Sequence, residues 1–71
     1  MSTADLLAIS DPADRAVAAN DLLWSQPGHA QSLREARRQA IVEAVDQGRT
    51  HHGLAELLHV CPDDLAWMIQ L

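Results

Sequence analysis

The chain has 71 residues, a net charge of -5 at pH 7 and a single cysteine. A domain of this length buries about 60% of the surface that its unfolded chain exposes, which leaves little room for a substrate cavity. The acidic balance argues against indiscriminate binding to nucleic acid or anionic lipid, because both favour a basic protein face. Cys61 has no partner for an internal disulfide, and no stretch resembles a signal peptide or approaches the ~20 apolar residues of a membrane span. We therefore expect one soluble, cytoplasmic domain over residues 1–71.

Apolar residues recur at three-to-four spacing almost throughout, and no segment alternates as a strand does. This pattern predicts an all-α fold of four to five helices. Residues 3–9 are expected to add a short helical turn. Asp11 is expected to cap the first substantial helix, which starts at Pro12, has Asp14 in its positive first turn and runs to about Ser25. The apolar residues from which its buried face is drawn are Ala16, Val17, Leu22, Leu23 and Trp24.

The longest helix is expected after the break at Pro27 and Gly28. Ser32, with Glu35 three residues later, has the pattern of a capping box and predicts the start of this helix. Gly48 is typical of the position just past a helix C-terminus and predicts its end. The buried stripe of this helix is expected to contain Leu33, Ala36, Ala40, Ile41, Ala44 and Val45.

Two short helices are predicted to follow, the first capped by Thr50 and the second beginning at Pro62. Their apolar residues lie where two helices that cross at a tight turn need them, which predicts a helix-turn-helix over residues 50–70. Residues 32–70 then form a tri-helical core that follows the N-terminal helices of residues 1–27. The inward-facing residues of the unit, including Val60 in the turn, are expected to be Leu54, Ala55, Leu58, Val60, Leu65, Met68 and Ile69.

The N-terminal helices carry more apolar surface than residues 1–27 can bury alone. A core of this size contributes roughly 3–5 kcal/mol of net stability, so association with a second copy is a reasonable expectation. The sequence therefore predicts a homodimer that forms through these helices. The residues expected at that interface are Leu6, Leu7, Ile9, Leu22, Leu23 and Trp24.

Three runs resemble a known family in their order and spacing. They are ISDPADRAVAANDLLWS, SLREARRQAIVEAVDQG and THHGLAELLHVCPDDLAWMI, which together cover most of residues 9–70. They resemble small actinobacterial and phage helix-turn-helix proteins, in which the final unit is similar to the promoter-reading region 4 of sigma factors. The most specific part is the small Ala55 among apolar residues, with a turn between Leu58 and Cys61. The resemblance implies a sequence-specific regulator of transcription that binds double-stranded DNA as a dimer, with residues 62–70 in the major groove.

Two positions depart from the family pattern. His59 stands where the family usually has Gly, in a turn that tends to require positive φ. Cys61 stands where Ser or Thr usually caps the recognition helix. Of the side chains that the family directs at bases, only Gln70 is a usual base reader, since carboxylates at best accept from cytosine N4 and repel phosphates. The residues implied to face bases are Cys61, Asp63, Ala66, Trp67 and Gln70.

Basic residues are candidates for phosphate contacts. Arg49 precedes the helix capped by Thr50, and the backbone N–H groups of His51 and His52 at that helix start also favour a phosphate. Three further arginines cluster in the first turns of the long helix, where they either position the protein on a duplex or form a solvated face offset by acidic neighbours. These three are Arg34, Arg37 and Arg38, and the neighbours are Glu35 and Glu43.

A second hypothesis makes the chain a degenerate helix-turn-helix that binds protein instead of DNA. The acidic edge of Asp63 and Asp64, together with Trp67, Met68 and Leu71, would dock on a basic and apolar surface. That surface would belong to a regulator, a polymerase component or a second copy of the chain. Alternatively, Trp67 folds back over Leu71 or the N-terminal segment and completes the small core.

The sequence offers no convincing metal or catalytic site. Imidazole and thiolate are ligands that zinc prefers, and three histidines and the cysteine lie near the C-terminal end. Their spacing lacks a paired knuckle, and no nucleophile, base and orienting acid stand at a telling spacing. We therefore expect neither an enzyme nor a cofactor, metal or small-molecule substrate. The four residues considered for zinc are His51, His52, His59 and Cys61.

Overall fold

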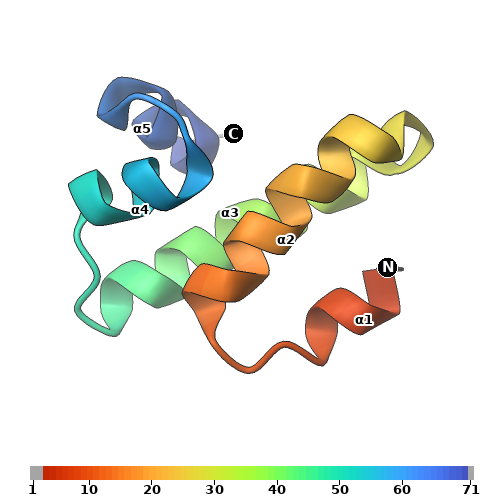
Figure 1. Ribbon diagram of the computed structural model, residues 1–71, viewed down its shortest axis with the longest axis horizontal. Coiled ribbons are helices and arrows are strands. Elements are labelled where there is room, and N and C mark those ends of the chain that lie inside the picture. Colours follow the sequence, from red (N-terminus) through yellow and green to blue (C-terminus); the bar gives the residue numbers. More distant parts are fainter. Residues whose placement is uncertain (1–2, 71) are drawn as a thin grey trace.

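The computed structural model describes the backbone of residues 3–70 and the side chains of residues 5–69. Over this range the chain is helical and contains no strand, which confirms the predicted all-α class. No helix in this range is both long enough and apolar enough to cross a membrane. The elements in chain order are α1 (Thr3–Leu7), α2 (Pro12–Ser25), the 3-10 turn η1 (Pro27–His29), α3 (Ala30–Asp46), α4 (His51–Leu58) and α5 (Pro62–Gln70) (Figure 1).

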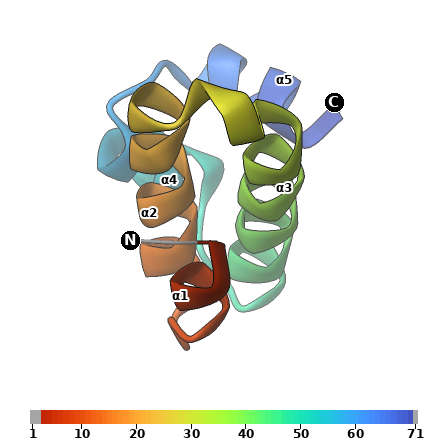
Figure 2. The same cartoon turned by 90° about the vertical axis from the view of Figure 1, so that its right-hand side faces the viewer.

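Helices α2 and α3 lie side by side and form the body of the molecule, linked at one end by η1 (Figure 2). The start of α2 is as predicted: the Asp11 side chain accepts a hydrogen bond from the Asp14 N–H at 3.4 Å, and Pro12 occupies the first turn. Pro12 is suited to that place because its fixed φ is helical and its missing N–H would have no partner there.

The predicted capping box at the start of α3 is wrong. The helix begins at Ala30, and Ser32 and Glu35 already lie inside its first turns. The reason is η1, which runs directly into α3: Ala30 has helical φ and ψ, and its N–H donates to the Pro27 carbonyl. Because the chain is already helical before Ser32, that residue has no free helix end to cap.

The predicted end of α3 is confirmed. Gly48 follows the helix with φ of 102°, a conformation that L side chains rarely adopt. The N–H of Gly48 donates to the Val45 carbonyl at 3.0 Å, and the N–H of Arg49 donates to the Ala44 carbonyl at 3.0 Å. This pair of bonds is a Schellman motif, which satisfies carbonyls that the helix end leaves free.

Helix α4 begins and ends with specific caps. The Thr50 hydroxyl accepts from the Gly53 N–H at 3.0 Å, as predicted. At the other end His59 adopts φ 59° and ψ 41°, so the positive φ expected at this position is confirmed. The Val60 N–H then donates to the Ala55 carbonyl at 3.0 Å, which turns the chain within three residues toward α5.

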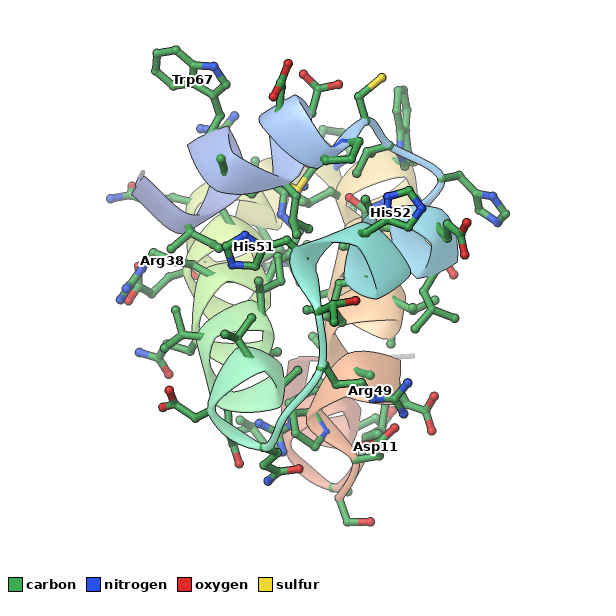
Figure 3. The ribbon with its side chains drawn as sticks, turned by 90° about the vertical axis from the view of Figure 1, so that its left-hand side faces the viewer. Asp11, Arg38, Arg49, His51, His52 and Trp67 are labelled. Atoms are coloured by element: carbon green, nitrogen blue, oxygen red, sulfur yellow. The ribbon has the colours of Figure 1, made fainter. Side chains whose placement is uncertain are left out.

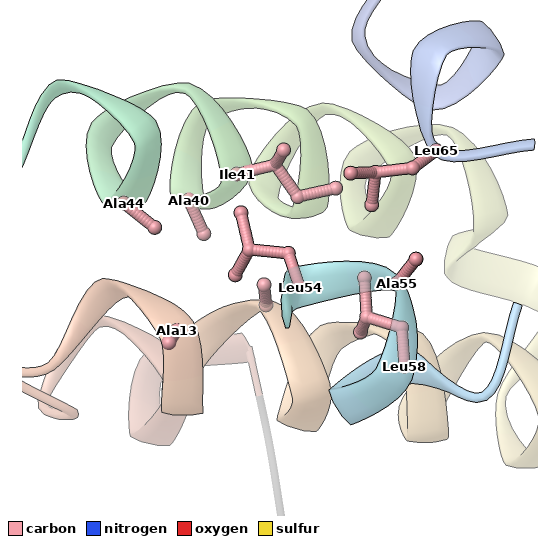
Figure 4. Close-up of a cluster of buried hydrophobic side chains, with 9 residues drawn as sticks. Ala13, Ala40, Ile41, Ala44, Leu54, Ala55, Leu58 and Leu65 are labelled. Carbon is pink, nitrogen blue, oxygen red and sulfur yellow. The ribbon is translucent and has the colours of Figure 1, made fainter. Parts of the chain in front are cut away.

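Two clusters of buried side chains make the core. The larger joins α2, α3, α4 and α5, and the inward faces predicted for the last two helices are confirmed (Figure 4). The smaller cluster consists of Leu6, Ala19, Leu22 and Leu33, and it holds α1 against α2 and α3. The buried residues of the larger cluster are Ala13, Ala16, Ala40, Ile41, Ala44, Leu54, Ala55, Leu58 and Leu65.

The N-terminal apolar residues divide into two groups. Leu6 and Leu22 are buried within the monomer, which removes them from the interface predicted for residues 1–27. Leu7 and Trp24 are 75% and 86% exposed. Trp24 is therefore not part of the core, although the helical spacing made it a candidate.

Candidate interaction surface

Helix α5 has one buried side and one exposed side. Leu65 is fully buried, and Met68 and Ile69 are half-buried, so these three residues fix the helix on the body. Trp67 is 62% exposed and points away from the body (Figure 3), which excludes the alternative that it folds back over the N-terminal segment, while Leu71 lies outside the described residues. The physical reason is that Leu65 already fills the space above α3 and α4. Gln70 lies at the end of α5, and its side chain is outside the described residues.

The first turn of α5 is acidic and exposed. Asp63 and Asp64 lie there, next to the exposed Cys61, and neither carboxylate is in an ion pair within the described part of the chain. The positive end of the helix dipole stabilises both charges. Ala66 is half-buried between the two sides. The exposed face of α5, defined here by Asp63, Asp64 and Trp67, therefore combines negative charge with one large aromatic side chain.

Arg49 does not flank α5. Its guanidinium lies 3.8 Å from the Asp11 carboxylate, and both residues lie at the end of the molecule away from Trp67 (Figure 3). Thr50 is occupied in capping α4, and His51 is exposed at the start of that helix. The phosphate site predicted at this helix start is therefore separate from the exposed face of α5.

Arg38 is paired with an acidic neighbour. Its Nε donates to Glu35 Oε2 at 3.1 Å, and its Nη2 forms a further short contact with the other carboxylate oxygen. The hydrogen bond from Arg38 lowers the pKa of the Glu35 carboxyl, and the same bond raises the pKa of Arg38. Arg15, which the sequence did not single out, pairs with Glu43 at 2.8 Å and also donates to the Ile9 carbonyl. Both arginines are thus engaged within the chain.

Arg37 connects three helices. Its Nη1 donates to Asn20 Oδ1 at 2.8 Å, and Asn20 Nδ2 donates to the Leu58 carbonyl at 3.5 Å. Burial lowers the pKa of Arg37, and the charge of nearby Arg34 lowers it further. Arg34 itself is exposed and forms no hydrogen bond or ion pair with the described residues. Neither Arg34 nor Arg37 is in an ion pair with the described residues, and of the two only Arg34 is exposed.

A groove of about 650 Å³ lies where α2, η1 and α3 face the turn after α4. It continues through Arg34, Arg37 and Met68 into a second hollow of about 550 Å³. The sequence did not predict this groove, since it depends on how the α2–α3 pair meets α5. Its lining includes Leu23, Trp24, Arg34, Arg37, Val60 and Met68.

The four residues considered for zinc are spread over α4 and the following turn. His52 lies 3.5 Å from Glu56 in an exposed i,i+4 pair. His59 occupies the turn, and Cys61 is an exposed free thiol. Among the described residues, no three His, Cys, Asp or Glu side chains gather as a metal site would need. The geometry therefore gives these residues no shared chemical role.

Comparisons with known proteins add no family to this description. No protein-family model matches the chain, and neither the curated proteins nor the solved structures contain a match.

Proposed function

We propose that α4, the turn at residues 59–61 and α5 are a helix-turn-helix unit, and that the chain uses this unit to bind protein through the exposed face of α5. Three local features support the unit: the Thr50 cap, the left-handed His59 and Val60 packed under the turn. They hold α5 on the body by one side and leave its other side free. The resemblance to small helix-turn-helix regulators supports the helix-turn-helix unit itself, although it implies DNA as the partner.

The observation that carries the proposal is the chemistry of the exposed face of α5. Its charged groups are Asp63 and Asp64, and its large side chain is Trp67, 62% exposed. Aromatic anchors dominate the energetics of protein interfaces, whereas affinity for DNA comes largely from Lys and Arg side chains that neutralise phosphates. Among the five arginines of this chain, only Arg34 is both exposed and without a partner among the described residues. The fitting partner is therefore a protein surface with basic groups and an apolar hollow.

Sequence-specific DNA binding is the second candidate, and one observation favours it. Arg34 and Arg37 line the hollow beside Met68 of α5, so positive charge does lie next to the helix that would enter the major groove. Surface ion pairs contribute only about 0–1 kcal/mol, which would let Arg38 exchange Glu35 for a phosphate. In this role Gln70 would contact a base, and a dimer would span two half-sites.

The two candidates are separated by two selections with the same purified protein. One uses a random-sequence duplex library at low and near-physiological salt. The other uses a display library of helical peptides that combine Lys or Arg with Leu, Met or Trp. We expect no enriched DNA motif even at low salt, where attraction to phosphate is strongest, and enrichment of peptides from the display library.

The Asp63→Asn/Asp64→Asn variant provides the mechanistic check. Under the proposal it weakens peptide binding, because the basic groups lose their partners, whereas under the DNA hypothesis it strengthens retention of duplex. The Asp14→Asn/Asp46→Asn variant makes the same change in charge at exposed positions elsewhere and should behave as the parent protein. A defined DNA motif whose enrichment rises in the first variant would replace the proposal by the second candidate.

A further inference from the structure

The groove beside α5 has the properties required of the partner. Its α3 wall carries the positive charges of Arg34 and Arg37, and its apolar lining includes Leu23, Val60 and Met68. Asp21 contributes one carboxylate from α2. The hollow that continues from it also contains Glu35, but that carboxylate is already paired with Arg38. The α3 wall of the groove therefore offers net positive charge beside an apolar surface.

The exposed face of α5 complements this groove in two ways: its charge is opposite to that of the α3 wall, and its indole is an apolar group that an apolar hollow can accept. It carries two carboxylates with no ion pair among the described residues, and its indole is large enough to fill part of an apolar hollow. We propose that the chain pairs with a second copy of itself, the exposed face of α5 of each copy docking in the groove of the other. This inference rests on the proposed function, because it takes the exposed face of α5 to be a protein-binding surface.

The placement of the two surfaces allows such a pair to close. Helix α5 and the η1 link beside the groove both lie on the side of the molecule that faces away from α1, toward the two ends of its long dimension (Figures 1 and 2). A two-fold axis through this side can bring each groove to the α5 of the other copy at once, which gives a closed dimer. Trp24 lines the groove and is 86% exposed in the single chain, so the same contact covers both exposed tryptophans. This interface differs from the one expected from residues 1–27, since it leaves α1 outside.

Charge reversal with complementation tests the pair. Arg34→Glu and Asp63→Lys/Asp64→Lys each place like charges at both contacts of the dimer, so each variant alone should dissociate at least about tenfold more readily than the parent protein. An equimolar mixture of the two variants restores opposite charges at both contacts and should form the mixed dimer. Trp67→Ala should also weaken the pair by at least about tenfold, as an interface anchor does. Sedimentation equilibrium at several concentrations measures each dissociation constant.

Arg49→Glu is the matched control for Arg34→Glu, because it makes the same change in net charge at the end of the molecule away from Trp67. It should dimerise as the parent does. Circular dichroism checks that every variant is folded, which the exposure of Arg34, Asp63, Asp64 and Trp67 favours.

Three results would overturn the inference: a parent chain that stays monomeric at millimolar concentration, a dimer that tolerates Trp67→Ala and Arg34→Glu, or variants that fail to complement each other. The peptide selection separates these failures from failure of the proposed function. A monomer that still binds basic apolar peptides through Trp67 keeps the proposed function and loses the second copy as partner. A monomer that binds no peptide loses both.

Discussion

His59 is the only non-glycine residue with positive φ among the described residues. A side chain in the left-handed region costs about 1–2 kcal/mol, while glycine costs roughly 0.5–1 kcal/mol more entropy on folding. The difference predicts that His59→Gly stabilises the fold by about 0.5–1 kcal/mol, measured by urea unfolding at concentrations where the chain is monomeric. His29→Gly is the control, because His29 is also exposed but has φ of -114°. Equal effects of the two substitutions would mean that backbone strain at His59 is negligible.

The Arg38–Glu35 pair predicts a pH-dependent effect at one carboxyl. Arg38 holds the pKa of Glu35 below its ordinary value of 4.5, so the charged form is favoured in the folded chain. The stability that this pair contributes is therefore present above the unfolded pKa and is lost as pH falls through the folded pKa. Arg38→Gln should raise the pKa of Glu35 toward 4.5, as carboxyl chemical shifts in an NMR titration would report. A carboxyl that titrates identically in both proteins would contradict the pairing.

Residues whose role is local were predictable from the sequence. Asp11, Thr50 and Gly48 act on the backbone within a few positions, so their neighbours along the chain are sufficient to identify them. Trp24 and Trp67 were ambiguous, because helical spacing alone does not show which neighbour reaches a large side chain first. Leu65 and Leu33 fill the available space, and both indoles are left outside.

At the scale of elements, α5 depends on one fully buried side chain. Leu65 is completely buried between α3 and α4, and the other apolar contacts of α5 are only half-buried. Leu65→Ala should lower the free energy of unfolding by about 2–5 kcal/mol, a loss that approaches the whole net stability of a domain this small. We therefore expect α5 to detach, with its amides losing more hydrogen-exchange protection than those of α2 and α3. Trp67→Ala, on the exposed side of the same helix, should change the free energy of opening measured by hydrogen exchange by less than about 0.5 kcal/mol in the monomer. Uniform loss of protection in Leu65→Ala would show that α5 unfolds only with the rest.

The start of α3 and the groove show what sequence patterns miss at this scale. Ser32 and Glu35 form a genuine capping pattern, but η1 makes the chain helical before it is reached. The groove is shaped by α2, η1, α3 and the turn after α4 together, and no single segment carries a signal for it. Patterns within a single element were sufficient to predict the helices. The surfaces between elements could not be predicted in this way, because they depend on how the helices pack against one another.

At the scale of the whole molecule, α2 and α3 run through both core clusters. Ile41 lies in the larger cluster and Leu22 in the smaller, yet both clusters are built on the same helix pair. This arrangement predicts a single cooperative unit, in which neither cluster unfolds alone. Ile41→Val removes one methyl group from the larger cluster and should lower the free energy of unfolding by about 0.5–1.5 kcal/mol.

Native-state hydrogen exchange measures how far that loss spreads. If the molecule is a single cooperative unit, Ile41→Val lowers the free energy of opening by the same amount at two places. These are the slowest-exchanging amides near Leu22 in α2 and those near Leu54 in α4. Leu22 is not a member of the larger cluster, so an effect there reaches it through the shared helices and not through a direct contact. A loss confined to α4 and its neighbours would instead divide the molecule into two units. The smaller cluster with α1 would then keep its protection while the unit that presents α5 opens.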